Sequence, residues 1–399
     1  MPGRALAAQE QGEGHEGPAL APARPRGPEA ARRDRARPPQ PGGHRGALGE
    51  DPHLQLPAEP ADRPPRQPEP APPARPPGRG PRPAAGRHAG PLPGRAAQGR
   101  GARLSLPTAA SLAREGTAVL RRAGVAAPAA DAEALLAHVL GFERAHLHAE
   151  PESAVRDEDA ARFRDLVARR AARVPLQHLT GVQEFWSLRF QVGPAVLIPR
   201  PESELLIEAF LRLNRRPDPI VVDVGTGSGC LAIVVAHETP GALVHATDVS
   251  EEALMVARLN AASLDVAGRI AFYRGDLLEP LGGLGLEGQV DFILSNPPYI
   301  GEGELASLEP EVRDHDPRPA LTPGPDALAI HRRLAAEAPP FLRPGGCLVV
   351  EMGAGQEAPL RRIYGGAGSG LDIVETIPDL AGIPRVLIGR SEHGGILPP

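Results

Sequence analysis

IVVDVGTGSGCLAIVVA, residues 220–236, is the stretch of sequence that decides the fold of this chain. Its first five residues form an apolar run that predicts a buried strand, its glycines predict a tight turn, and its second apolar run predicts a helix. Glycines let a backbone approach a ligand closely, and the first N–H groups of a helix can bind that ligand. A glycine-rich turn is a weak signal when it stands alone, so its meaning depends on the motifs that follow.

Two carboxylates follow the next two predicted strands. Asp248 ends the run 242–248, 25 residues after Asp223, and Asp276 follows the run 270–274. The first carboxylate can accept hydrogen bonds from both hydroxyls of a ribose, and the second can accept one from an adenine amino group. The turn and the two carboxylates therefore predict an adenosine pocket. The alternative for both is a helix N-cap, a position that Asp favours.

A second candidate site is Asn296-Pro297-Pro298-Tyr299, which directly follows the apolar run 290–295 of another predicted buried strand. The NH2 group of an amide or an aromatic base is a poor nucleophile, because its lone pair is delocalised. The Asn296 side-chain oxygen and the Pro297 carbonyl can accept both N–H protons and aim the nitrogen, while Tyr299 provides a flat wall. The two prolines fix this backbone at little entropic cost. The alternative is that Asn296 only forms a turn before proline.

These motifs, in this order, resemble those of class I S-adenosylmethionine-dependent methyltransferases that act on planar amino groups. From about residue 104 to about residue 390, the chain resembles the HemK/PrmC family of release-factor glutamine methyltransferases. Further stretches that carry this resemblance are 174–181, 184–186, 197–204 and 382–390. The resemblance implies an α/β fold with a doubly wound, seven-stranded Rossmann-like sheet and S-adenosylmethionine as the cofactor. It also implies a class I peptide chain release factor as the protein partner, methylated at the glutamine amide nitrogen of its Gly-Gly-Gln motif.

The resemblance implies a role for each motif residue. The methyl donor lies over the glycine turn with its sulfonium toward Asn296, and neither a metal ion nor a His base is needed. The cofactor-binding residues that it implies are Gly225, Thr226, Gly227, Ser228, Gly229, Asp248, Asp276, Leu277 and Asn296. The catalytic residues that it implies are Asn296, Pro297, Pro298 and Tyr299.

Three positions depart from the family pattern. Ser203 stands where the family often has Thr, Leu197 where it often has an aromatic residue at the pocket mouth, and Leu277 where some members have Trp. The hydroxyl is retained at position 203, whereas Leu277 would cover the adenine by apolar contact alone. Two charged residues keep alternative interpretations: Glu351 is structural or lines the pocket, and Arg200 clamps a partner or anchors the linker.

Composition and patterning divide the chain into four segments. Residues 1–103 are a low-complexity extension, 104–175 a small helical domain, 176–200 a hairpin linker and 201–392 the methyltransferase domain. The first 100 residues contain 23 of the 49 prolines and no Phe, Trp, Tyr or Ser, so they cannot form a packed core. We interpret the extension as a spurious upstream segment or a disordered arm. A transit peptide fits poorly, because it would be rich in Ser and poor in acids.

Periodicity locates the elements of the two domains. Helices are predicted at 109–123, 130–140, 158–173, 201–213, 230–237, 251–262, 326–339 and 356–364. Strands are predicted at 220–224, 242–248, 270–274, 290–295, 348–352, 371–375 and 385–388, the last of them antiparallel. Residues 182–192 predict a hairpin with Trp186 in the core. In the family the helical domain helps to recognise the protein substrate; the alternative is a stabilising cap.

Charge and hydropathy argue against several function classes. The first 100 residues carry 16 Arg and 10 acids, and this formal +6 leaves −11 for residues 101–399 out of the total of −5. An acidic folded part argues against direct binding of nucleic acid, which needs a basic face, and fits a basic protein partner. No apolar stretch of 18 residues occurs, so we expect a cytoplasmic protein without membrane insertion. We expect a monomer, and the two cysteines are too few for a disulfide framework or a zinc site.

Three other functions stay open. A methyltransferase that acts on a flipped nucleic-acid base would use the same pocket, but it needs a target-recognition insertion, for which residues 300–325 are too short. A nicotinamide dehydrogenase would share the glycine turn and Asp248 but has no use for Asn-Pro-Pro-Tyr. The third is a donor-binding protein without catalysis.

Overall fold

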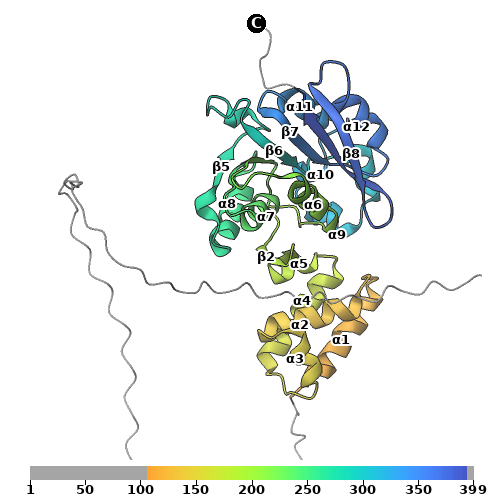
Figure 1. The fold of residues 1–399 in the computed structure, drawn as a ribbon. Coiled ribbons are helices and arrows are strands. Elements are labelled where there is room, and N and C mark those ends of the chain that lie inside the picture. Colours follow the sequence, from red (N-terminus) through yellow and green to blue (C-terminus); the bar gives the residue numbers. More distant parts are fainter. Residues whose placement is uncertain (1–105, 393–399) are drawn as a thin grey trace, which may run out of the picture. The chain divides into compact units, whose positions relative to one another are not determined.

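The computed structural model describes residues 106–392, and the extension expected at residues 1–103 lies outside this range. The described chain begins with a helical domain that has its own apolar core (Figure 1). In the described chain, its helices are α1 (Ala109–Arg122), α2 (Pro128–Leu140), α3 (Arg144–Ala149), α4 (Asp157–Ala171) and α5 (Leu176–Thr180). The three helices predicted for this domain are confirmed. The additional α3 and α5 have only 6 and 5 residues, too few to show a helical period.

Local sequence explains where these helices begin and how closely they pack. A capping box starts α1, in which the Thr108 hydroxyl accepts a hydrogen bond from the Ser111 N–H and the Ser111 hydroxyl accepts one from the Thr108 N–H. Pro128 opens α2, as proline often does at a first helical position. A Cβ on Gly116 of α1 would lie 2.7 Å from the Phe163 ring of α4, so this glycine permits the close contact.

A hairpin links the two domains. Its strands β1 (Val182–Phe185) and β2 (Leu188–Gln191) pair antiparallel around a turn of Trp186 and Ser187, whose φ angles are 54° and 59°. The Trp186 N–H donates to Glu204 Oε1 at 2.8 Å, and the Trp186 indole N–H donates to Glu238 Oε1 at 3.1 Å. These bonds hold a turn that usually needs Gly or Asn. The predicted hairpin is confirmed, and Trp186 packs against the core with part of its surface exposed.

The second domain is built on a sheet that, in the described chain, has seven strands in the order β5-β4-β3-β6-β7-β9-β8. They are β3 (Ile220–Val224), β4 (Leu243–Asp248), β5 (Ile270–Arg274), β6 (Val290–Ser295), β7 (Leu342–Glu351), β8 (Leu371–Pro378) and β9 (Pro384–Ser391). Neighbours from β5 to β7 are parallel, and β9 is antiparallel to both β7 and β8. The predicted fold class is confirmed. Because the chain changes direction across the sheet between β3 and β6, a crevice forms at their carboxyl ends.

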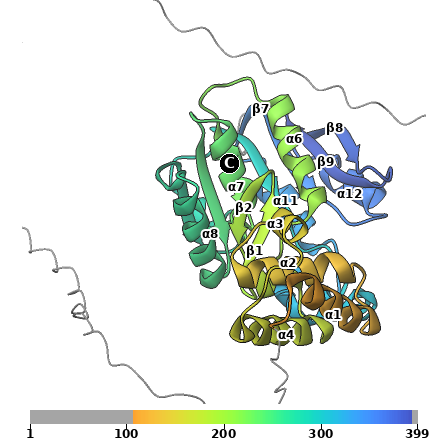
Figure 2. The same ribbon diagram turned by 90° about the horizontal axis from the view of Figure 1, so that it is seen from below.

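Helices cover both faces of this sheet (Figure 2). The helices α6 (Glu204–Leu213), α7 (Cys230–Glu238) and α8 (Glu251–Ser263) share one apolar core with it, and α11 (Ala329–Glu337) and α12 (Glu357–Tyr364) share the other. The helix predicted at 326–339 is shorter, because the Asp326 carboxylate accepts the Leu328 N–H in a turn. Short helical segments complete the domain: Pro201–Ser203, Ala267–Arg269, Glu279–Leu281, Glu302–Ser307, α9 (Pro310–His315) and α10 (Arg318–Leu321). Within residues 106–392, no helix is both long and apolar enough to cross a membrane.

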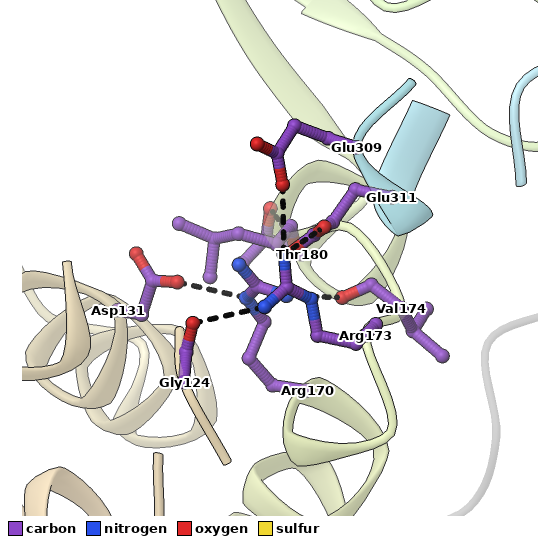
Figure 3. A network of polar contacts seen from close by, with 9 residues as sticks. Gly124, Asp131, Arg170, Arg173, Val174, Thr180, Glu309 and Glu311 are labelled. Carbon is purple, nitrogen blue, oxygen red and sulfur yellow. Dashed lines mark hydrogen bonds and ion pairs between the residues drawn. The ribbon is translucent and has the colours of Figure 1, made fainter. Parts of the chain in front are cut away.

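An ion-pair network joins the helical domain to α9, in the segment that follows Asn-Pro-Pro-Tyr (Figure 3). The Arg170 guanidinium of α4 donates to Asp131 Oδ2 and to Glu311 Oε1, each at 2.8 Å. Arg173 donates to Glu311 Oε2 at 2.6 Å and to Glu309 Oε2 at 3.2 Å. The Arg170 side chain is only 8% exposed. Its positive charge is therefore compensated by these carboxylates and not by water.

We expect Arg170→Ala to lower the free energy of unfolding by about 3–5 kcal/mol, because it leaves the Asp131 carboxylate without a cationic partner in a mostly buried place and leaves Glu311 with Arg173 alone. Arg164→Ala is the matched control. Arg164 lies on the same helix and pairs with Glu115 at 2.8 Å, but its side chain is 50% exposed, so its loss should cost less than about 1 kcal/mol. Urea unfolding of both variants measures the difference, and equal losses would contradict a special role for Arg170.

Candidate active site

The glycine turn between β3 and α7 is held in place by Asp223. This residue is fully buried, and its Oδ2 accepts hydrogen bonds from the Thr226 hydroxyl at 2.7 Å and from the Ala232 N–H at 3.1 Å. Burial raises the pKa of the Asp223 carboxyl to about 6. Gly225 and Gly227 have φ angles of 74° and 55°, which residues with a side chain rarely adopt. The turn therefore depends on its glycines and on the carboxylate beneath it.

Asp248, at the end of β4, faces the same turn. Its Oδ2 accepts a hydrogen bond from the Gly227 N–H and its Oδ1 accepts one from the Ser250 N–H, each at 2.9 Å. The N-cap of α8 is Ser250, whose hydroxyl accepts the Ala253 N–H, so a helix-cap role for Asp248 is wrong. Burial raises the pKa of Asp248. Each carboxylate oxygen has a second lone pair, so Asp248 keeps acceptor capacity toward the cavity that it lines.

Asp276 and Leu277 reach the same cavity from the loop after β5. Asp276 is half-exposed, and its Oδ2 accepts a hydrogen bond from Arg333 at 2.8 Å. The next helical segment begins at Glu279 with Leu278 as its N-cap residue, so Asp276 does not cap it. Leu277 has a φ of 47°, an uncommon conformation for a residue with a side chain.

The main cavity, of about 260 Å³, lies at the carboxyl ends of the central strands. The predicted site residues in its lining are Gly225, Gly227, Asp248, Asp276, Leu277, Asn296, Pro297 and Pro298. Thr226 and Ser228 line a smaller neighbouring cavity, which Ser203 also borders. Gly229 is the N-cap of α7, and a Cβ there would lie 3.2 Å from the Ala257 Cα of α8. The glycine at 229 therefore serves helix packing.

A second cavity, of about 180 Å³, adjoins the main one. Asn296 and Pro297 line both cavities, and Tyr299 lines only the second of the two. Leu197 also borders both cavities, which agrees with its expected place at the pocket mouth. The residues predicted from sequence, except Thr226, Ser228 and Gly229, are thus brought together around two adjoining spaces that meet at the Asn-Pro pair.

Two side chains beneath the Asn-Pro-Pro-Tyr segment complete the polar structure of the site. The Asn296 Nδ2 donates to the Ser203 Oγ at 3.0 Å, and the Ser203 hydroxyl donates to Glu351 Oε2 at 2.6 Å. The Tyr299 hydroxyl donates to Glu351 Oε1 at 3.3 Å. Burial raises the pKa of Glu351 to about 7. Glu351 borders none of four cavities found in the described residues, so the interpretation that it lines the pocket is not supported. It is buried and is bonded to the motif through Ser203 and Tyr299.

Arg200 anchors the segment that follows the motif. Its guanidinium donates to Asp316 Oδ2 at 2.6 Å, and the Asp316 side chain is fully buried. Burial also raises the pKa of Asp316 to about 6. Asp316 is the buried partner of Arg200, and sequence reasoning missed it because it lies 116 residues from Arg200 and no local pattern links the two. Among residues 106–392, no group of three or more His, Cys, Asp or Glu side chains could hold a metal ion.

Comparisons with known proteins match both domains. Residues 111–181 match the PrmC N-terminal domain family, and residues 201–308 match the methyltransferase small domain family. A release factor glutamine methyltransferase from Cereibacter sphaeroides is 43% identical over 262 residues, which cover 66% of this chain and 91% of that protein. One from Moorella thermoacetica is 43% identical over 265 residues, 66% of this chain and 92% of that protein.

A solved structure is also similar in sequence. The protein-(glutamine-N5) methyltransferase (release factor-specific) from Alicyclobacillus acidocaldarius is 30% identical. The alignment covers 51% of this chain and 99% of that one, with a TM-score of 0.30.

Glu351 should make stability depend on pH. Its pKa is about 7 in the folded protein, against 4.5 for an exposed Glu, so the folded protein binds more protons between these values. Stability from this group is therefore complete below pH 4.5 and is lost as pH rises through about 7, by about 3 kcal/mol in total. Glu351→Gln has no carboxyl to titrate at this position, so the free energy of unfolding of this variant should fall less with rising pH than that of the wild type. Urea unfolding of both proteins at pH 5 and pH 8 measures the difference.

The control for this measurement is Glu152→Gln, which makes the same chemical change at an exposed side chain. We expect this variant to follow the wild-type pH dependence. If Glu351→Gln follows it as well, the carboxyl of Glu351 does not titrate as its burial requires.

Proposed function

The chain belongs to the release factor glutamine methyltransferase family, and we propose that its substrate atom is the amide nitrogen of the glutamine in a Gly-Gly-Gln motif. It is an S-adenosylmethionine-dependent methyltransferase that acts on release factors. The proposed acceptor protein is a class I peptide chain release factor. We place the reaction in the cytoplasm, carried out by a monomer that makes no direct contact with nucleic acid.

The observation that best supports this proposal is the position of Asn296 and Pro297. They line two adjoining cavities, and the larger one ends at the carboxyl ends of the parallel strands, where ligands bind in doubly wound sheets. A methyl transfer needs two such spaces, one for the donor and one for the acceptor, that meet at the reacting atoms. A donor-binding protein without catalysis would not need the second cavity.

The larger cavity has the residue types that suit an adenosine-containing donor. Asp248 offers carboxylate acceptors for ribose hydroxyls, and Asp276 offers one for an adenine amino group. Leu277 and Ile330 provide apolar lining. S-adenosylmethionine supplies the methyl group from its sulfonium. We propose that the turn from Gly225 to Gly229 binds the donor mainly through Gly225 and Gly227, with Thr226 and Ser228 supporting the turn.

The second cavity, of about 180 Å³, suits the glutamine amide. The Asn296 side-chain oxygen and the Pro297 carbonyl accept the two N–H groups of that amide, which aims the nitrogen toward the donor and raises electron density on it. The Tyr299 ring limits the cavity beside the amide plane. Pro298 keeps the Pro297 carbonyl in place. The proton leaves after the new N–C bond has made the nitrogen acidic, so positioning carries most of the rate.

Transfer of labelled methyl from S-adenosylmethionine to a purified class I release factor tests the function. We expect labelling of the wild-type factor and none of a factor whose Gly-Gly-Gln glutamine is changed to alanine. Labelling of DNA or RNA in place of either factor would overturn the proposal.

Two variants should separate the donor and acceptor roles. We expect Asn296→Ala to lower kcat by about 100-fold or more while donor affinity changes little, because it removes an acceptor that acts on the substrate amide. We expect Asp248→Ala to weaken donor binding by about tenfold or more, because it removes the proposed ribose contact and a bond to the turn. Calorimetric titration with S-adenosylmethionine, combined with initial rates, measures both. Equal loss of donor affinity in the two variants would contradict the division of roles.

A further inference from the structure

An asparagine side chain has two ends of opposite hydrogen-bonding character. Its oxygen accepts hydrogen bonds, and its NH2 group donates them. In the proposed function only the oxygen of Asn296 can bind the N–H groups of a glutamine amide, since the NH2 end would repel them. Some part of the protein must therefore determine which end faces the acceptor cavity.

The hydrogen-bond chain beneath the motif has a fixed direction. Above about pH 7 the Glu351 carboxyl is ionised and can only accept, so the single proton of the Ser203 hydroxyl goes to it, at a distance of 2.6 Å. The Ser203 Oγ then offers only lone pairs to Asn296, and the group that it meets at 3.0 Å is the Asn296 NH2. The Asn296 oxygen is thereby left for the acceptor cavity.

The position of Ser203 in its helix supports a role outside helix stability. It ends the helical segment Pro201–Ser203, which runs directly into α6, and its φ and ψ angles of −68° and −16° are themselves helical. Its side chain makes no capping hydrogen bond to α6. Here the hydroxyl is buried and turned toward Asn296 and Glu351 instead.

The environment of Glu351 also points to a role in holding the motif rather than in stabilising the fold. Glu351 is 2% exposed, and its carboxylate accepts hydrogen bonds from two neutral hydroxyls. One is that of Ser203, which contacts Asn296 at the start of the Asn-Pro-Pro-Tyr segment, and the other is that of Tyr299 at its end. A buried carboxylate is costly, and a well-packed apolar residue would be more stable there. One carboxylate that receives hydrogen bonds from both sides of the motif fixes the Asn296 amide and the Tyr299 ring together.

From this arrangement we infer that Ser203 and Glu351 are positioning residues for the methyl transfer, which hold the Asn296 side chain with its oxygen toward the substrate amide. This inference rests on the proposed function and adds two residues to it. Neither residue needs to touch substrate or donor for this role. Their effect passes through Asn296 and Tyr299.

The test compares Ser203→Ala with Ser203→Thr. The first removes the hydroxyl and frees the Asn296 amide to turn, so we expect kcat on the release factor to fall by about tenfold or more, with KM and donor affinity within about twofold of wild type. The second keeps the hydroxyl, so we expect kcat within about threefold of wild type. Ser263→Ala, which removes a hydroxyl bonded to a backbone carbonyl in α8, is the control for general effects and should keep wild-type kcat.

Glu351→Gln provides an independent variant. Its amide can donate to the Ser203 oxygen and release the Ser203 proton toward Asn296, which favours the reversed amide, so we expect a loss in kcat of about tenfold with donor affinity unchanged. Thermal unfolding of each variant verifies that it is folded. Wild-type kcat in both Ser203→Ala and Glu351→Gln would overturn the inference, and so would a Ser203→Thr variant as slow as Ser203→Ala. Methyl labelling of the release factor by the wild-type enzyme tests the proposed function separately. If the wild-type enzyme does not label the factor, the proposed function is wrong, whatever the variants of Ser203 and Glu351 do.

Discussion

The parallel pairing of β3 with β6 is the constraint on which the rest of the site depends. Val224 lies opposite Ser295 in this ladder, so the chain leaves both strands at the same edge of the sheet. The glycine turn and the Asn-Pro-Pro-Tyr segment, about 70 residues apart in sequence, therefore start side by side. The helices that follow go in opposite directions across the sheet and leave a crevice between the two segments. The segments proposed to bind donor and acceptor are adjacent because β3 and β6 are paired.

Sequence predicts the parts of this structure that are local. All seven strands of the large sheet overlap predicted apolar runs. The signal is strongest for the central parallel strands β3 and β6, which are buried on both faces and show no alternation. The motifs were also predictable, since each lies within a few residues of a strand end. The hairpin turn shows a limit, because Trp186 and Ser187 adopt positive φ without any turn residue and are held by carboxylates distant in sequence.

The contacts that could not be predicted span long distances in the chain. Ser203 and Glu351 are 148 residues apart, and Arg170 and Glu311 are 141 residues apart. A pattern within one element contains no information about such partners. Asp223, Asp316 and Glu351 share a further property, because burial raises the pKa of each of the three. The site is therefore built at a cost in stability, as is common where geometry matters more than the strength of folding.

The network around Arg170 has a consequence for the wall of the second cavity. Arg170 binds Glu311, and the next residue, Val312, lines the cavity that Asn296 and Tyr299 also line. One short helix thus has an ion pair to the helical domain at one residue and forms part of the cavity wall at the following one. A displacement of α9 therefore changes both contacts together, so the fit between the two domains and the shape of this cavity are not independent.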